Sequence, residues 1–232
     1  MSSSTWLAHD LKRVDCFLPL SFLLTLSPRE NQYVAIKGLN GYTTDLIHRG
    51  RVWELEALKL ISSTPNPSPH CLNLLSSFTV PGKGSSGEHI CIVTQLLGGD
   101  AKTLHEAQNG KVFPLPLAKR ILLHVLRGIA HAHRSGVVHT DLKHDNIFFD
   151  TTMSTAEIEK LVASEPALRH PPEASHDGIV QAAVSQPLPV PALEEATKCT
   201  YVVADFGSGR FPNKLTTPYS VSISAVDRQP PS

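Results

Sequence analysis

A polar stretch near the middle of the chain concentrates side chains that could perform chemistry. It reads His139-Thr140-Asp141-Leu142-Lys143-His144-Asp145-Asn146 and forms a short turn between two predicted strands. Carboxylate and amide oxygens are hard ligands of the kind that Mg²⁺ requires, and lysine is a point charge suited to phosphate groups. Capping of a loop would explain any one of these side chains, but it does not explain the set at fixed offsets.

Two further patterns lie on either side of this stretch. Val34-Ala35-Ile36-Lys37 precedes it and Asp205-Phe206-Gly207 follows it, and each of these is weak when taken alone. In this order the three patterns resemble the signature set of protein kinases. The resemblance implies that ATP and Mg²⁺ bind between two lobes and that the γ-phosphate passes to a serine or threonine of a protein substrate.

The resemblance assigns a role to each charged side chain. Asp141 is then the catalytic base that orients the substrate hydroxyl, and Lys143 neutralises charge near the γ-phosphate. Lys37 holds the α- and β-phosphates of ATP, while Asn146 and Asp205 supply oxygen ligands to Mg²⁺. A lysine two places after the catalytic aspartate resembles serine/threonine kinases more than tyrosine kinases.

Lys37 needs a carboxylate partner, because a buried lysine stays charged and in place only when it is paired. The predicted helix 51–61 offers Glu54 and Glu56. We favour Glu54, because Leu58 then follows one turn later, where the family has an apolar residue that packs toward the phenylalanine of D-F-G. Glu56 remains the alternative partner.

Other stretches are similar to the SR-protein kinases and their fungal relatives. The motif H-T-D-L-K is typical of that group, and the stretches W-E-L-E-A-L-K-L-I and D-F-G-S-G-R-F are similar to it. Thr140 replaces an arginine that usually pairs with a phosphorylated activation segment, so control by such phosphorylation is not expected. The resemblance makes Thr94 the gatekeeper, places Ala35, Gln95 and Leu97 in the ATP site, and suggests Arg/Ser-rich proteins as substrates.

Periodicity and chain-breaking residues place these motifs on a coarse secondary structure. Helices are predicted over 51–61 and 117–133, and the second helix has one apolar face made of Leu117, Ile121, Val125, Ile129 and Ala132. Residues 62–70 form a Pro/Ser loop. Strands are predicted over 31–39, 71–80, 89–97, 136–139, 146–150 and 200–204.

Residues 151–198 are expected to be an insertion between two of these strands. Ser154-Thr155-Ala156-Glu157 is a capping-box pattern, which predicts a short helix with Ile158, Leu161 and Val162 facing inward. Sequence rich in Pro, Ala and Ser follows over residues 165–191. Such an insertion also occurs in many fungal members of the resembled group.

We therefore expect an α+β, bilobal, protein-kinase-like fold. Residues 1–97 form a small sheet-rich lobe, and residues 98–232 form an incomplete helical lobe that ends at the activation segment, near residues 225–231. No G-x-G-x-x-G phosphate loop precedes Lys37 in the sequence, and residues 4–10 resemble the strand that normally follows such a loop. Residues 11–29 have no family counterpart and are interpreted as an aberrant insertion.

These departures leave a second function open. A catalytically inactive kinase fragment, or a pseudokinase that binds nucleotide or protein, is the alternative to an active enzyme. All the catalytic side chains are present, which argues against a decayed site. The missing glycines argue for loss of activity, because only glycine lets backbone amides approach phosphates closely.

The composition argues against other classes of protein. Lys plus Arg and Asp plus Glu both total 21, so no nucleic-acid or membrane partner is indicated. The four scattered cysteines predict free thiols in a reducing compartment, the cytoplasm or nucleus. The apolar run 16–26 is shorter than the roughly 20 residues that a membrane-spanning helix needs. A signal peptide, and hence a secreted protein, is the rival interpretation.

Residues 165–191 carry the first prediction. They lack the apolar density that would offset the entropy lost on ordering, so their amides should exchange rapidly with deuterated solvent. Hydrogen exchange of the purified chain measures this directly, with the predicted helix 117–133 as the slow internal reference. Slow exchange throughout 165–191 would mean that the segment packs against the rest of the chain.

Overall fold

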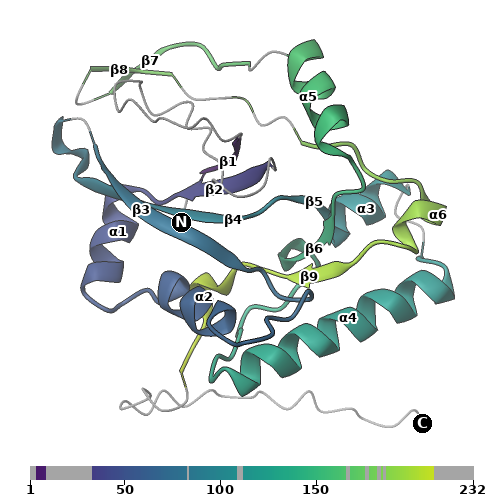
Figure 1. Ribbon diagram of the computed structural model, residues 1–232. Helices are drawn as coiled ribbons and strands as arrows, with labels where there is room; N and C mark the ends of the chain where they lie inside the picture. Colours follow the sequence, from purple (N-terminus) through teal and green to yellow (C-terminus); the bar gives the residue numbers. More distant parts are fainter. Residues whose placement is uncertain are drawn as a thin grey trace, which may run out of the picture.

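The computed structural model describes residues 4–8, 33–82, 84–108, 112–165, 168–175, 178–181, 184 and 187–211. The apolar run 16–26, the interpreted insertion 11–29 and the end of the activation segment lie outside these ranges. Four antiparallel strands form one sheet in the order β1-β2-β4-β3 (Figure 1). They are β1 (Ser4–Ala8), β2 (Val34–Gly38), β3 (Leu74–Pro81) and β4 (Glu88–Gln95).

The alternation of side chains along β2 decides which way Lys37 points. Val34 and Ile36 are buried in an apolar cluster with Cys91 and Val93 of β4. Successive side chains of a strand face opposite sides of the sheet, so Lys37 projects from the other face. The strand that carries V-A-I-K therefore holds one face in the core and presents its lysine away from it.

Two helices, α1 (Gly41–His48) and α2 (Glu54–Ser62), lie on the same side of this sheet (Figure 1). Helix α2 was predicted from the sequence, whereas α1 was not. Asn40 caps α1 by accepting a hydrogen bond from the Thr43 amide at 2.8 Å, which is a favoured N-cap arrangement. Thr44 of α1 accepts a hydrogen bond from the Ile90 amide of β4 at 3.0 Å, so α1 is attached to the sheet through a buried hydroxyl.

The second half of the described chain is built around a long helix and a small sheet. Helix α4 (Leu115–Arg134) lies beside the three-stranded sheet β5-β6-β9, and the short helix α3 (Ala101–Ala107) follows β5. The strands are β5 (Leu97–Asp100), β6 (Ile147–Asp150) and β9 (Tyr201–Val203). This small sheet lies between the four-stranded sheet and α4 (Figure 1).

A glycine allows α4 to approach its neighbours closely. A Cβ at Gly128 would lie 2.3 Å from the carbonyl oxygen of His70 and 3.0 Å from Cγ2 of Val203. The Cys71 thiol also donates a hydrogen bond to the Gly128 carbonyl at 3.0 Å. At this point only glycine lets the helix touch both the loop before β3 and strand β9.

The predicted face of the long helix is largely the buried one. Leu117, Val125 and Ala132 are buried, while Ile121 and Ile129 are half-buried against the core. The predicted strand 136–139 is wrong, since only an isolated bridge between Val138 and Arg210 forms there. A single bridged residue pair, with no paired neighbours before or after it, does not make a strand.

The insertion contains more secondary structure than the sequence predicted. Helix α5 (Thr155–Ser164) begins with the predicted capping box of Ser154 and Glu157. Ile158 is buried and Leu161 half-buried as expected, but Val162 is exposed, so the inward face is narrower than predicted. A small hairpin, β7 (Glu173–Ser175) with β8 (Gly178–Val180), and the short helix α6 (Leu193–Ala196) follow.

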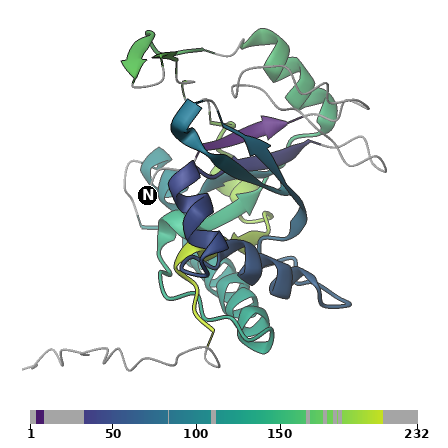
Figure 2. The same cartoon turned by 90° about the vertical axis from the view of Figure 1, so that its left-hand side faces the viewer.

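The two ends of the insertion contact different parts of the fold. Cys199, just after α6, is buried, and its carbonyl accepts a hydrogen bond from Arg120 of α4 at 2.7 Å. In both views α5 and the β7–β8 hairpin lie beyond the four-stranded sheet, on the side away from α4 (Figures 1 and 2). Burial raises the pKa of Tyr33 beside β2, and the charge of Glu159 on α5 raises it further.

Among the described helices, none combines the length and the apolar composition required to span a bilayer. Even the longest of them, α4, carries charged residues along its length.

Two stacked histidines attach β9 to the rest of the fold. The rings of His70 and His124 lie 4.2 Å apart, and both side chains are buried. His124 Nδ1 accepts a hydrogen bond from the Tyr201 amide at 3.1 Å, while the Tyr201 carbonyl lies 3.2 Å from Nδ1 of His70. Burial lowers the pKa of His124 to about 4, and the charges of His70 and Arg120 add to the effect.

The His124 pKa predicts a pH-dependent stability. Because the folded pKa lies below the ordinary value, this stabilisation is complete above pH 6.5 and is lost as the pH falls from 6.5 toward 4. A shift of this size corresponds to a loss of up to about 3 kcal/mol of unfolding free energy. Urea titrations between pH 7.5 and 4.5 measure it.

The matched control is His124→Asn, which keeps an acceptor for the Tyr201 amide but cannot be protonated in this range. Its unfolding free energy should fall less over the same pH interval. Equal pH dependence in the two proteins would show that another group controls acid unfolding.

Candidate active site

The lysine of β2 and a glutamate of α2 form the ion pair at the centre of the site. Lys37 Nζ lies 2.6 Å from Glu54 Oε1 and 3.4 Å from Asp205 Oδ1. Glu54 is almost fully buried, whereas Asp205 is half-exposed. Burial acts to lower the pKa of Lys37, but the two carboxylates more than offset it, so the pKa is raised and the ammonium group stays charged.

Of the two glutamates that the sequence left open, the structure brings Glu54 to Lys37. Glu56 is exposed on another face of α2. Leu58, one turn after Glu54, is fully buried and shares a core cluster with Phe206 of D-F-G. The burial of Leu58 fixes the rotation of α2, and this rotation directs Glu54 into the site.

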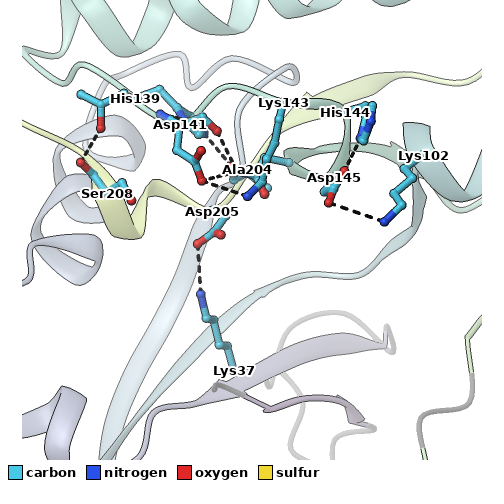
Figure 3. A network of polar contacts seen from close by, with 12 residues as sticks. Lys37, Lys102, His139, Asp141, Lys143, His144, Asp145, Ala204, Asp205 and Ser208 are labelled. Carbon is cyan, nitrogen blue, oxygen red and sulfur yellow. Dashed lines mark hydrogen bonds and ion pairs between the residues drawn. The ribbon is translucent and has the colours of Figure 1, made fainter. Parts of the chain in front are cut away.

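The turn that contains Asp141 holds three functional groups together. Lys143 Nζ lies 3.1 Å from Asp141 Oδ2 (Figure 3). The side-chain Nδ2 of Asn146 donates a hydrogen bond to the backbone carbonyl of Asp141 at 2.8 Å and lies 3.4 Å from Asp141 Oδ2. A hydrogen bond to Asp141 and its negative charge raise the pKa of Lys143. Asp141 is half-exposed, so a substrate hydroxyl could reach the carboxylate.

Strand β9 joins this turn to the D-F-G residues. The Ala204 amide donates to the Asn146 carbonyl at 2.9 Å, and the Ala204 carbonyl lies 2.8 Å from His139 Nε2 (Figure 3). His139 is buried, and its ring lies 4.9 Å from that of Phe206. These contacts place Asp205 next to the Asp141 turn, although the two residues are 64 positions apart in the sequence.

Two residues near the site have left-handed backbone conformations, which are unusual for side chains other than glycine. Asp205 has φ 60° and Thr140 has φ 62°. The Thr140 hydroxyl donates a hydrogen bond to the Ser208 carbonyl at 2.6 Å, which connects the Asp141 turn to the residues after D-F-G. Arg210 then forms a bridge with Val138, so this segment is attached at two points.

The residues expected in the adenine region lie where β4 continues into β5. Ala35 pairs in register with Thr94, which is buried. Gln95 accepts a hydrogen bond from the Asn73 amide at 3.0 Å, and Leu97 begins β5 and is half-buried. Ala35 and Lys37 occupy alternate positions of β2 and so share a face, which favours one binding region for base and phosphates.

Asn146 and Asp205 have the chemistry that a Mg²⁺–nucleotide complex requires. Both offer hard oxygen atoms, and the Ala204 hydrogen bond to Asn146 holds their backbones together. Within the described ranges, no cluster of three or more His, Cys, Asp or Glu side chains could hold a metal alone. A two-residue set suits Mg²⁺, which usually completes its shell with water and substrate phosphates.

The contacts that couple these groups were not predicted from the sequence. They include the contact of His139 with the Ala204 carbonyl and the partner of the Thr140 hydroxyl. The position of Arg210 over the Trp53 ring, 5.8 Å from its centroid, was not predicted either. The only available signal was the spacing of the motifs, because each contact joins residues far apart in the chain.

Comparisons with known proteins bear on the fold and the family of the chain. The model of one protein family, described as the protein kinase domain, matches residues 23–161. A crystal structure of a kinase domain aligns with a TM-score of 0.50 and 16% sequence identity, covering 82% of this chain and 47% of that chain. At this identity the likeness shows the fold.

Several curated relatives are serine/threonine kinases. Serine/threonine-protein kinase SRPK of Physarum polycephalum is 36% identical over 99 residues, which is 42% of this chain and 23% of the relative. SKY1 of Saccharomyces cerevisiae is 26% identical and covers 72% of this chain and 20% of its own. SRSF protein kinase 3 of Mus musculus is 26% identical, with 69% and 25% covered. The chain spans about a quarter or less of these relatives.

The ion pair of Lys37 predicts a measurable change in lysine reactivity. Glu54→Gln removes the nearer carboxylate, so burial should lower the pKa of Lys37 and increase the fraction of the reactive neutral amine. Labelling with an amine-reactive reagent at pH 8, quantified at Lys37 by mass spectrometry, should be faster in this variant. Glu56→Gln is the matched control and should label at the unsubstituted rate. If Glu56→Gln alone accelerated labelling, Glu54 would not be the partner that controls the lysine.

Proposed function

The chain belongs to the protein kinase domain family, and from this premise we propose that it transfers the γ-phosphate of ATP to serine or threonine hydroxyls of protein substrates. One observation carries the proposal. The fold brings the Lys37–Glu54 pair, the Asp141 turn and Asp205 into one site, although they come from separate parts of the sequence. Charged side chains that served only to solvate or cap their own loops would have no reason to meet across the fold in this way.

Each residue has a task that follows from its surroundings. Lys37 remains charged because carboxylates surround it, so it can hold phosphate oxygens of ATP. Asn146 and Asp205 would hold Mg²⁺, which supplies charge neutralisation on the phosphates when it is bound. Asp141 would accept the proton of the attacking hydroxyl, and Lys143 lies close enough to neutralise charge beside it.

The substrate class is proposed at a finer level. Relatives named SRPK and SRSF protein kinase support proteins rich in Arg and Ser as substrates. A cytoplasmic or nuclear location is proposed with this class.

Asp141→Asn tests the catalytic role. The variant keeps the size and polarity of the side chain but is a much weaker proton acceptor, so transfer should fall roughly a hundredfold or more. Nucleotide binding should be nearly unchanged, because no contact to the Lys37–Glu54 pair is altered. The measurement is transfer of radiolabelled phosphate from ATP to an Arg/Ser-rich peptide, with a peptide in which Gln replaces Arg for comparison. Binding of a fluorescent ATP analogue is measured in parallel.

Asp45→Asn is the matched control, since Asp45 is exposed on α1 and pairs with Arg49 away from the site. Near-normal transfer by Asp141→Asn would refute the catalytic role. Nucleotide binding without any transfer by the unsubstituted chain would favour the alternative function, a nucleotide-binding module.

A further inference from the structure

The loop between α2 and β3 contains two hydroxyl–proline pairs. Residues 63–70 read Ser-Thr-Pro-Asn-Pro-Ser-Pro-His, so Thr64 and Ser68 each precede a proline. The prolines of this loop are exposed. Proline fixes its own φ and disfavours the helical conformation of the residue before it, so both hydroxyl residues lie in chain that prefers to be extended.

One face of α4 is basic opposite this loop. Arg127, His131 and Arg134 are spaced by four, three and seven positions, so they fall on the same side of the helix. Both arginines are exposed. Within the part of the chain that the structure describes, no hydrogen bond or ion pair to a carboxylate engages either guanidinium group. Two cations therefore stand beside the loop without an anionic partner from the described residues.

An open pocket of about 470 Å³ is lined by residues of both the loop and the helix. Ser68 and Pro69 line it on the loop side, and Arg127 and Arg134 line it on the helix side. Water occupies roughly 30 Å³ per molecule, so the space is large enough for a phosphate group with several waters. Ser68 is thus the hydroxyl that shares one pocket with both arginines.

The two hydroxyls of the loop differ in accessibility. The Thr64 hydroxyl is buried and has no hydrogen-bond partner among the described residues, so an enzyme could not reach it without moving the loop. Ser68 is half-buried, and its Oγ accepts a hydrogen bond from the His70 amide at 3.2 Å. This contact orients the Ser68 side chain and leaves its own proton free to be replaced.

We propose that Ser68 is a phosphorylation site for a proline-directed serine/threonine kinase, and that Arg127 and Arg134 bind the resulting phosphate. In the reaction the Ser68 oxygen attacks the γ-phosphorus of ATP, an Oγ–P bond forms, and the bond from the γ-phosphorus to the bridging oxygen breaks. ADP leaves, and the hydroxyl proton passes to the catalytic base of the modifying kinase. Phosphoserine carries a charge of about −1.5 to −2, which two arginines can balance.

The position of the loop gives this modification a structural consequence. The loop follows directly after α2, the helix that carries Glu54. The carbonyl of Ile61, near the end of α2, already lies 3.0 Å from Nε2 of His131 on α4. A phosphate between Ser68 and the α4 arginines adds a second connection, which holds α2 against α4. Any effect on phosphate transfer by this chain rests on the proposed function, but the modification and its binding site do not.

Phosphorylation is tested on the full chain carrying Asp141→Asn, which suppresses self-phosphorylation. A recombinant proline-directed kinase and radiolabelled ATP are the probe, and a reaction without added kinase is the blank. Because other hydroxyl residues of the chain also precede proline, the label is located by mass spectrometry of proteolytic peptides. Ser68 should be labelled in the parent protein and in a Ser63→Ala control, whose hydroxyl is exposed but precedes threonine. Label in the peptide that contains residue 68 should fall at least tenfold in Ser68→Ala and in Pro69→Ala. Undiminished label of this peptide in Ser68→Ala, or no label on Ser68 in the parent, would overturn the proposal.

The bound phosphate has a signature of its own. The second pKa of a solvated phosphoserine is about 6, and two nearby arginines should lower it. A phosphorus NMR titration of the Ser68-phosphorylated chain measures this value. Arg127→Gln with Arg134→Gln should return it to about 6, whereas Arg49→Gln on α1 should leave it lowered. A value of about 6 before any substitution would show that the arginines do not hold the phosphate.

Discussion

The Lys37–Glu54 ion pair is the constraint to which the other parts of the site are adjusted. Removing two charged groups from water costs desolvation free energy. The attraction between the charges offsets this cost only when their geometry is good and further hydrogen bonds satisfy both groups. Here Glu54 is almost fully buried, and Asp205 supplies a second carboxylate at the exposed side of Lys37. The pair therefore needs β2, α2 and the D-F-G residues in their observed places at the same time.

Strand β9 transmits this constraint to the catalytic turn. Its neighbour Ala204 hydrogen-bonds to Asn146 and His139, and its own Tyr201 bonds to the His70–His124 stack. The left-handed backbone of Asp205 persists because these contacts fix the chain on one side, while the Phe206 ring is buried on the other. The three-residue strand β9 thus connects the Lys37 and Asp205 side of the site to Asp141, the proposed proton acceptor.

Much of the fold could be predicted, and the failures have physical causes. Helix α4 was predicted because residues 117–133 repeat one apolar face, and α2 because the apolar residues of 51–61 recur at helical spacing. Helix α1 was missed because its burial uses Thr43 and Thr44, whose hydroxyls do not appear in an apolar pattern. The strand predicted at 136–139 failed because β propensity alone cannot supply a pairing partner.

By itself the sequence determined which side chains are available and in what order, since the three motifs and their spacing are local features of the chain. It also narrowed the partner of Lys37 to two glutamates on one helix. Only the tertiary structure decided between them, because the choice depends on how Leu58 rotates α2 against Phe206. The same holds for the contacts of His139, Thr140 and the α4 arginines. Each joins residues that are distant along the chain, and packing alone brings such residues together.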